Sequence, residues 1–567
     1  MSNTSHLPGP FRGTARVPRL GRHATVRLLI ALLAASATSA ASAKTITVAA
    51  GDDLQRALDG VEFGDVVELE AGATFQGNFI LRALERPRRR FTDEDWITIR
   101  STEHEKLPQR GDRVQPAHAK HMPKIVSAND RPALSADFGA SRYHFLGLEF
   151  TASNQVCYNV ILFGYDGLRN SSPATKMSQL PNHLVFDRCY IHGNPTGNIR
   201  RGIALNARNA TVMDCYLSDF HEKGADSQAI CAWNGSGPFK IVNNYLEAAG
   251  ENVLFGGGKT TIPKVIPSDI EIRFNYFYKP RSWQKGHKDF AGTAWVVKNL
   301  LEFKNGRRAV IEGNIFENCW VHGQTGFAIL FTPRTEPGID PRRAVEDITF
   351  QKNLVRDSAS GIQMANQHRR TDAQGNLLTT TVLRRIHIQD NIFWNIATGS
   401  NQARSRILEL SARADCEPAK AVVIENNTFL HGGIGNSLIS TGDYPVFAEN
   451  FVFRNNITTC GRYGIIGTSA APGMETVKRY FRGHQIRGNV FISPNRFRAF
   501  PPHNFEAVNL AAVGFGDPAS GNFQLTRKSP FRGRGTDRLD PGADHAALAM
   551  ALEGVKSGQR RKLLKTP

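Results

Sequence analysis

The chain has 567 residues, of which 41% are hydrophobic, and a formal net charge of +19 at pH 7. This composition is sufficient to bury a large core. Its seven cysteines form no CxxC pair and no His/Cys cluster with metal-ligand spacing, which excludes a zinc site and a redox motif of the usual kinds. The positive charge favours a polyanionic partner through long-range attraction.

The first 43 residues are predicted to be an export signal. They contain five arginines and no acidic residue, followed by the apolar run LLIALLAASA and the small residues Ala41-Ser42-Ala43. The apolar run is too short to span a bilayer, and no other segment approaches ~20 apolar residues. We therefore expect cleavage before Lys44 and a mature protein that is secreted or periplasmic, with no membrane partner.

A short helix is predicted near the start of the mature chain. In the stretch DDLQRALDGV, residues 52 to 61, two aspartates precede apolar residues at the spacing of an amphipathic helix. Such a helix would close the open end of a stack of strands, where unpaired backbone groups would otherwise be exposed.

One short pattern then repeats ten times. Each copy has an apolar residue, two variable positions, an Asn or Cys, one variable position and usually another apolar residue, as in IEGNIF and IQDNIF. The copies occupy residues 186–191, 212–217, 241–246, 272–277, 311–316, 350–355, 388–393, 424–429, 453–458 and 486–491. The Asn or Cys recurs at intervals of 26 to 39 residues, which is typical of stacked coils with constant strands and variable turns.

Stacking places like residues in ladders along the coils. We expect Asn244 through Asn489 to hydrogen-bond along such a ladder. Cys189 and Cys215 occupy the same position on consecutive coils, so that a disulfide between them is one alternative, although two stacked buried thiols are favoured. The odd number of cysteines leaves at least one free thiol.

These repeats, together with the start ITVAAGDDLQRALDGVEFGDVVELEAGATFQGNF, resemble the right-handed parallel β-helix of the pectate-lyase-like class over about residues 45 to 530. The resemblance implies an all-β, single-domain solenoid of about ten or more coils with an N-terminal helical cap. We assign it to residues 44–535, and residues 536–567 to a basic, partly disordered tail. This fold carries lyases, hydrolases, epimerases and adhesins, so the fold alone does not determine the function.

A second row of strands precedes the repeats of the middle coils. Because alternate residues of a strand face opposite sides, these strands have one apolar and one chemically rich face. The outward positions are occupied by Asn206, Trp233, Glu302, Lys304, Arg334 and Gln363, with Glu251 at a strand entrance. In the stretch VVKNLLEFKNGRRAVIEGNIF, residues 296 to 316, Lys298 belongs to the same charged face.

Two long insertions follow strands of this row. They are GGGKTTIPKVIPS after Phe255 and PRTEPGIDPRRAVED after Thr332. Loops that lengthen on one face of a solenoid usually build the walls of a groove. We therefore predict a substrate groove with the candidate substrate-binding residues Trp233, Asn206, Glu251, Gln363, Lys298 and His322.

The charged row has the residues needed for β-elimination from a uronate. That reaction requires a cation to neutralise the carboxylate, a base near C5 and a donor for the leaving oxygen. Lys304 is the predicted base, Arg334 the neutralising cation or acid, and Glu302 the group that orients the lysine. The arrangement is similar to the chondroitinase-B and alginate-lyase family, and this resemblance implies Ca²⁺ as a candidate cofactor, with Glu251 and Glu302 as candidate ligands.

Two other functions remain open. A glycoside hydrolase would use Glu251 and Glu302 as its acid and base, whereas a non-catalytic glycan-binding or surface solenoid would hold the same ligand without turnover. A polygalacturonase-like enzyme is disfavoured, because the only Asp-Asp pair, Asp52-Asp53, lies in the cap. The leading prediction is an exported polysaccharide lyase, a monomer that acts on an acidic polysaccharide and has no nucleic-acid partner.

Overall fold

The structure is a computed structural model that describes residues 43–165, 172–334, 342–366, 374, 380–397, 405–412, 416–433, 435–442, 448–492 and 500–560. The expected export signal lies outside these residues, apart from Ala43. A separate unit begins at Ala43, and the description below concerns that unit alone. None of its described helices has the length and apolar character needed to cross a membrane.

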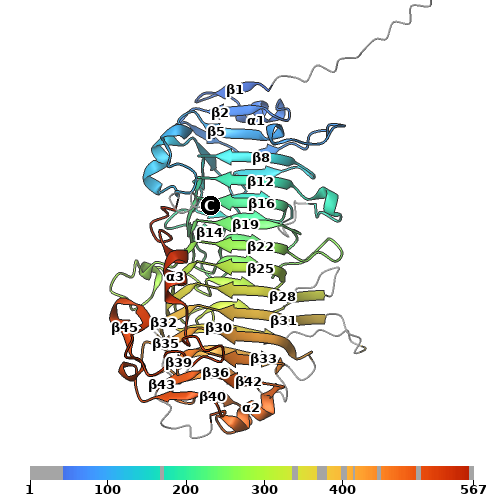
Figure 1. The fold of residues 1–567 in the computed structure, drawn as a ribbon. Helices are drawn as coiled ribbons and strands as arrows, with labels where there is room; N and C mark the ends of the chain where they lie inside the picture. The colour runs from blue at the N-terminus through green and yellow to red at the C-terminus, as the bar shows by residue number, and fades with distance from the viewer. Residues whose placement is uncertain are drawn as a thin grey trace, which may run out of the picture. The chain divides into compact units, whose positions relative to one another are not determined.

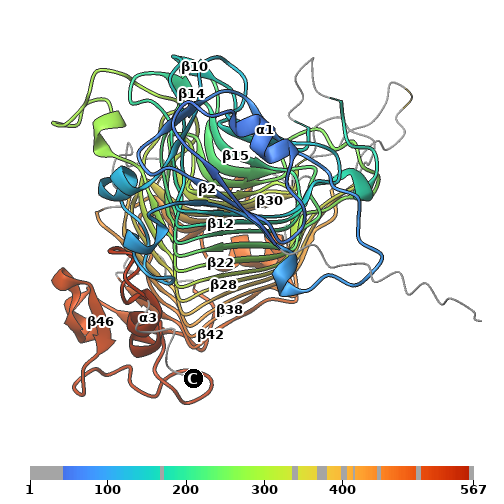
Figure 2. The same ribbon diagram turned by 90° about the horizontal axis from the view of Figure 1, so that it is seen from above.

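The chain winds into successive coils, and most coils contribute one strand to each of three parallel sheets, here named A, B and C. Figure 1 shows the strands of sheet A stacked in chain order, and Figure 2 shows the same coils from above. Sheet A consists of β1 (Thr45–Val48), β2 (Val66–Leu69), β5 (Ile97–Ser101), β8 (Ser141–Leu146), β12 (Asn182–Asp187), β16 (Arg208–Met213), β19 (Phe239–Val242), β22 (Ser268–Arg273), β25 (Gly306–Glu312), β28 (Arg342–Gln351), β31 (Thr380–Gln389), β34 (Ala419–Glu425), β37 (Ala448–Glu449), β38 (Val452–Arg454), β41 (Phe481–Arg482) and β42 (Gln485–Arg487).

Sheets B and C complete each coil. Sheet B consists of β3 (Thr74–Gln76), β6 (Lys124–Ser127), β9 (Glu149–Ala152), β13 (Tyr190–His192), β17 (Tyr216–Phe220), β20 (Tyr245–Ala248), β23 (Tyr276–Tyr278), β26 (Ile315–Cys319), β29 (Leu354–Ser358), β32 (Ile392–Ile396), β35 (Thr428–His431), β39 (Ile457–Thr459), β43 (Val490–Ile492) and β44 (Phe505–Ala507). Sheet C consists of β4 (Phe79–Leu81), β7 (Leu134–Ala136), β11 (Ile161–Phe163), β15 (Arg201–Leu205), β18 (Gln228–Ala232), β21 (Glu251–Phe255), β24 (Leu301–Phe303), β27 (Phe327–Phe331), β30 (Ser360–Asn366), β33 (Arg406–Ala412), β36 (Ser437–Thr441) and β40 (Ile465–Gly467).

The smaller elements lie outside these three sheets. They are the parallel pair β10 (Val156–Cys157) and β14 (Asn198–Ile199), the antiparallel pair β45 (Phe515–Asp517) and β46 (Asn522–Leu525), and the helices α1 (Leu54–Asp59), α2 (Met474–Tyr480) and α3 (His545–Leu552).

The core is a continuous apolar column enclosed by the three sheets. Residues in matching positions pair coil by coil, so that Phe255, Phe303 and Phe331 lie in register. Their ring centroids are 5.2 and 5.9 Å apart, and all three rings are fully buried. This architecture confirms the predicted all-β, right-handed parallel β-helix, in which parallel crossovers take the hand that is almost universal in proteins.

The predicted asparagine ladder is confirmed. The main-chain N–H of Asn244 donates to Oδ1 of Asn275 at 2.8 Å, and that of Asn275 donates to Oδ1 of Asn314 at 2.9 Å. The same contact recurs on each coil to Asn489 and continues to Asn504, which the repeat pattern did not include. Each rung therefore satisfies a buried backbone donor at the bend between sheets A and B.

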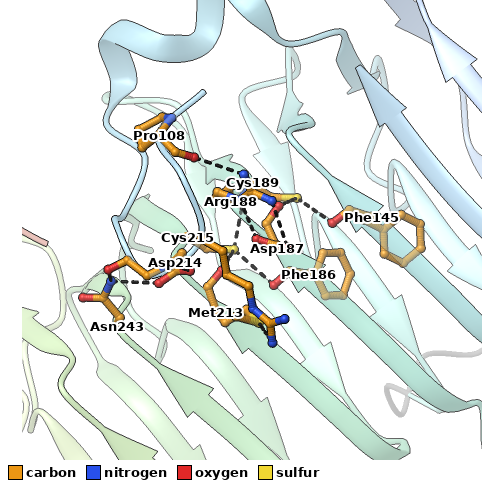
Figure 3. Close-up of polar contacts among 12 residues, drawn as sticks. Pro108, Phe145, Phe186, Asp187, Arg188, Cys189, Met213, Asp214, Cys215 and Asn243 are labelled. Atoms are coloured by element: carbon orange, nitrogen blue, oxygen red, sulfur yellow. Dashed lines mark hydrogen bonds and ion pairs between the residues drawn. The ribbon is translucent and has the colours of Figure 1, made fainter. Parts of the chain in front are cut away.

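Cys189 and Cys215 extend this ladder toward the N-terminus (Figure 3). The N–H of Cys189 donates to Sγ of Cys215 at 3.2 Å, and the N–H of Cys215 donates to Oδ1 of Asn244 at 2.9 Å. All seven cysteines, each among the described residues, are free thiols. The structure therefore has the favoured pair of stacked thiols, and burial raises the pKa of Cys215 well above its ordinary value.

The predicted cap is present at the first coil. Helix α1 begins after Asp53, whose side chain accepts a hydrogen bond from the N–H of Arg56 at 3.0 Å. Leu54 and Leu58 point into the core column, as the amphipathic spacing predicted. At the far end α2 packs on β40 and β41, and Thr476 accepts a hydrogen bond from the N–H of Gly467 at 3.0 Å.

Of the segment that we assigned to a basic, partly disordered tail, the structure describes residues 536–560. Residues 536–560, here named the C-terminal strap, run back along the outside of sheet B, and Figure 1 shows α3 beside earlier coils. Val555 packs on Tyr245, Tyr276 and Ile315, which form part of an apolar outer row. That row requires a cover, because an exposed apolar face of this kind is costly in water.

Candidate active site on sheet C

The charged row lies on the outer face of sheet C. Leu254, Glu302, Leu330 and Gln363 pair in register on β21, β24, β27 and β30. The strand of the central stretch is shorter than expected, because only Leu301–Phe303 forms β24 and residues 297 to 300 are irregular. The predicted apolar face of that stretch is nevertheless fully buried.

Acidic and basic side chains form ion pairs on this row and beneath it. Lys298 Nζ lies 2.6 Å from Asp226 Oδ2 and 3.4 Å from Glu251 Oε1. Lys304 Nζ lies 3.7 Å from Glu302 Oε2. The network extends through Gln228, whose Nε2 donates to Glu251 Oε2 at 2.7 Å. Each carboxylate of the site is thus matched by a lysine or an amide.

Glu302 is the most perturbed acid of this network. It is only 2% exposed, and burial raises its pKa to about 7, against the attraction of Lys304. The negative charge of the nearby Glu251 raises the pKa of Glu302 further. Glu302 therefore exchanges its proton near neutral pH, in direct contact with the candidate base.

Asp226 and Lys298 form a more strongly charged pair. Burial raises the pKa of Asp226, but the hydrogen bond and charge of Lys298 more than offset this, so the pKa is lowered overall. Burial lowers the pKa of Lys298, while the charge of Glu251 and the contact with Asp226 raise it, and the net direction is upward. Both groups are therefore charged at neutral pH.

The donor set does not fit calcium. Ca²⁺ takes six to eight oxygen ligands, whereas the candidate ligands Glu251 and Glu302 are already paired with Lys298 and Lys304. Over the part of the chain that the structure describes, no three His, Cys, Asp or Glu side chains are grouped so that they could hold a metal ion.

Two hollows flank this network on sheet C. The upstream pocket, of about 230 Å³, is lined by Tyr158, Tyr165, Arg200, Arg201, Asp226, Gln228, Cys231, Trp233, Leu254, Gly256, Gly257, Gly258, Lys259 and Lys304. The downstream pocket, of about 350 Å³, is lined by Glu302, Gln324, Thr325, Leu330, Thr332, Pro333, Arg334, Gln363 and Ala365. Lys304 lines one hollow and its partner Glu302 lines the other, so the pair separates two binding spaces.

The structure brings Arg334 next to Lys304. The main-chain N–H of Arg334 donates to the carbonyl oxygen of Lys304 at 3.0 Å, which places the two residues on consecutive coils. Arg334 is exposed, whereas the Lys304 side chain is 13% exposed. The insertion that follows Thr332 falls partly on residues 335–341, outside the described residues.

Two predicted substrate-binding residues lie in the hollows. Trp233 lines the upstream pocket, where its ring packs on the backbone of Gly258 and lies 5.1 Å from the guanidinium of Arg201. Gln363 lines the downstream pocket and donates to Glu409 Oε1 at 2.7 Å.

Four other predicted residues lie elsewhere. Asn206 is fully buried, and its side chain holds the corner after β15 by accepting from the N–H groups of Trp233 and Asn234, both at 2.9 Å. Glu251, Lys298 and His322 are not among the described residues that line the two hollows. The first two form the buried ion pair behind the row, and His322 accepts from the N–H of Val297 at 3.3 Å.

Sequence reasoning missed several residues of the upstream pocket. Arg200 and Arg201 stand at the entrance of β15, and Asp226 stands just before β18. The signal was available for the two arginines, because they stand at the start of a strand that the pattern had already assigned to the charged row. Tyr158 carried no such signal, since it comes from a turn before the first recognised repeat.

Comparison with known proteins gives structural neighbours only. No family model and no curated protein matches the chain. An alginate lyase from Paenibacillus sp. str. FPU-7 is similar at 14% identity and a TM-score of 0.35, over 67% of this chain and 93% of that one. The PL6 family alginate lyase AlyGC is similar at 13% identity and a TM-score of 0.45, over 88% of this chain and 57% of that one.

A further neighbour is the pectate lyase Pel9A, at 11% identity and a TM-score of 0.35, over 88% of this chain and 95% of that one. At these identities the likeness concerns the fold alone. The three parallel sheets of the chain itself carry the assignment: the protein is a right-handed parallel β-helix.

Proposed function

We propose that the chain is an exported polysaccharide lyase, secreted or periplasmic, that cleaves an acidic, uronate-containing polysaccharide by β-elimination. The observation that carries this proposal is the position of Lys304, between two hollows, beside Arg334 on the next coil and 3.7 Å from Glu302. A candidate base, a cation and an acid whose pKa lies near neutrality thus stand on consecutive coils of one open face.

In the proposed reaction Lys304 in its neutral form removes the proton from C5 of a uronate. The electron pair forms the C4=C5 double bond as the bond from C4 to the leaving oxygen breaks, and the leaving oxygen takes a proton from the lysine ammonium or from Arg334. Arg334 neutralises the uronate carboxylate, which stabilises the charge that develops as C5 loses its proton. Ionised Glu302 stabilises the ammonium formed on Lys304.

The geometry offers less support for a hydrolase that uses Glu251 and Glu302. Retaining and inverting glycosidases hold their carboxyl groups about 5 Å and about 6.5–9.5 Å apart, respectively. Glu251 is instead fully buried, pairs with Lys298 at 3.4 Å and lines neither hollow among the described residues. A carboxyl group enclosed in this way does not reach a sugar or a water molecule in the hollows.

The test is to incubate residues 44–567 with alginate, pectate, glucuronan and glycosaminoglycans and to follow the ultraviolet absorbance of unsaturated uronate. Wild type is expected to generate this absorbance and Lys304→Ala to lose it while still binding the polymer. Arg308→Ala, on the outside of β25 and paired with Asp269, is the matched control and should behave like wild type. Saturated reducing ends would establish a hydrolase, and binding without either product would establish a glycan-binding solenoid.

A further inference from the structure

The upstream pocket is built around the guanidinium of Arg201. Its Nε donates to Gln228 Oε1 at 2.9 Å, and Gln228 is held in turn by Glu251. The guanidinium carbon lies 4.7 Å from the ring centroid of Tyr158 and 5.1 Å from that of Trp233. The hydrogen bond to Gln228 and the two aromatic rings therefore fix the position of the guanidinium. This pre-organises the guanidinium for a planar partner.

The guanidinium of Arg201 is incompletely hydrogen-bonded within the described part of the chain. Its Nη1 is buried without a hydrogen-bond acceptor, and within the described ranges Arg201 takes part in no ion pair. Two neighbouring charged groups of the pocket do form ion pairs. Arg200 pairs with Glu222 at 3.5 Å, and Asp226 pairs with Lys298 at 2.6 Å. A buried donor without an acceptor is costly, and an anionic ligand would satisfy it.

The walls of the pocket fit a sugar ring. Tyr158, Tyr165 and Trp233 line it together with Arg201, and the exposed Lys259 contributes a second positive charge. Its volume of about 230 Å³ is below the 300–1,000 Å³ of pockets for drug-sized ligands, so it suits one ring rather than a chain segment.

We propose that the upstream pocket is a binding subsite for one carboxylated pyranose, whose carboxylate is held by Arg201. The inference that a polymer extends from this pocket to Lys304 rests on the proposed function. The inference that the pocket binds an acidic sugar does not rest on it. The polymer would then lie along the coils, with an acidic residue in the upstream pocket and the cleaved bond near Lys304.

The test is calorimetric titration with saturated trisaccharides of galacturonate, mannuronate and glucuronate, in the Lys304→Ala background so that no turnover intervenes. At least one trisaccharide is expected to bind, and its carboxyl-reduced form to bind at least about tenfold more weakly, because a charge-assisted hydrogen bond is lost. Arg201→Gln should weaken the binding of the acidic trisaccharide by a similar factor and leave the binding of its carboxyl-reduced form unchanged. Arg201→Lys should retain part of the affinity, and Arg308→Gln, the matched control, all of it.

Equal affinity of Arg201→Gln and its parent for the acidic trisaccharide would overturn the subsite, as would the absence of binding by all three ligands. The thermal midpoint of each variant identifies a folding defect, and the Arg201→Lys variant keeps the test valid if Arg201→Gln is unstable. Arg201-dependent binding without unsaturated product from wild type would retain the subsite and reject the lyase. Unsaturated product with Arg201-independent binding would do the reverse.

Discussion

The N–H of Arg334 donates to the carbonyl oxygen of Lys304 at 3.0 Å, so the two cations of the candidate site are fixed on consecutive coils by the backbone itself. We expect Arg334→Ala to lower the rate of unsaturated product formation by about 10²-fold, the scale of removing one charge-stabilising group. Lys304→Ala should reduce product formation to a small residual rate, well below that of Arg334→Ala. Because the two residues act on one step, the double variant should be no slower than Lys304→Ala alone. Initial rates at saturating polymer measure all three.

Arg308→Ala is the control for this series, since it removes an arginine on sheet A that faces solvent beside Asp269. Equal rates for Arg334→Ala and wild type would remove Arg334 from the mechanism. Fully additive losses in the double variant would show that the two residues act in separate steps.

Glu302 gives a pH dependence whose sign follows from its environment. Its pKa is raised from 4.5 to about 7, so between these values the folded state binds more protons than the unfolded state. The stability contributed by Glu302 is therefore present below about pH 4.5 and is lost as the pH rises through about 7. The loss is at most about 3 kcal/mol. Unfolding in denaturant at pH 5, 6, 7 and 8 should show this decline in wild type.

Glu302→Gln should flatten the decline and be more stable than wild type at pH 8. Glu271→Gln, on the outside of β22, is the matched control and should retain the wild-type slope. An unchanged slope in Glu302→Gln would mean that the proton is held elsewhere in the network.

Lys279 fills a cage of oxygen atoms directly behind the site. Its Nζ donates to the carbonyl oxygens of Ala248, Ala249 and Gly250 at 2.6, 3.0 and 2.7 Å, and to Asn252 Oδ1 at 2.9 Å. We expect Lys279→Met to lower the free energy of unfolding by about 3 kcal/mol, because these acceptors would remain buried and unpaired. Denaturant titration at pH 7 measures the loss.

Ammonium or potassium ions should restore part of that stability in Lys279→Met, since either can enter a cage of carbonyl oxygens. Sodium chloride at the same ionic strength is the control. Burial also lowers the pKa of Lys279 to about 8 from 10.5. The folded state then binds fewer protons than the unfolded state between these values, so wild-type stability should gain from this lysine as pH rises across that interval. No loss of stability in Lys279→Met would show that the cage is not a stabilising contact.

The asparagine ladder should be sensitive to single substitutions. Asn353 Oδ1 accepts from the N–H and the side-chain Nδ2 of Asn314, at 2.9 and 3.0 Å, and its own Nδ2 donates to the carbonyl oxygen of Ile311 at 2.9 Å. Asn353→Ala should cost about 2–3 kcal/mol, because fully buried groups lose their partners. Thr349→Ala, an outward position on β28, should cost less than about 0.5 kcal/mol. Similar losses in the two variants would show that the ladder adds no stability.

The fold was predictable because ten coils each carry their own copy of the signal. The bend asparagine needs a specific partner on the next coil, so the pattern survives at every repeat from Asn244 to Asn489. The site was only partly predictable, since alternation indicates which side chains face outward but not which are covered. Asn206 was wrongly assigned to the groove for this reason: the following strand and turn bury it completely. Asp226 was missed because its role depends on a contact with Lys298 that only the coiling produces.

The C-terminal strap has a consequence for the order in which the chain acquires its contacts. The N–H of Arg113 donates to the carbonyl oxygen of Gly558 at 2.8 Å, and the N–H of Arg560 donates to that of Gly111 at 3.1 Å. During translation, Gly111 emerges from the ribosome long before Arg560 is synthesised. The early coils can wind during synthesis, but one side of sheet B receives its cover only after the C-terminal strap has been made. Synthesis of the strap, rather than the completion of the last coil, then sets the moment at which the first coils become fully packed.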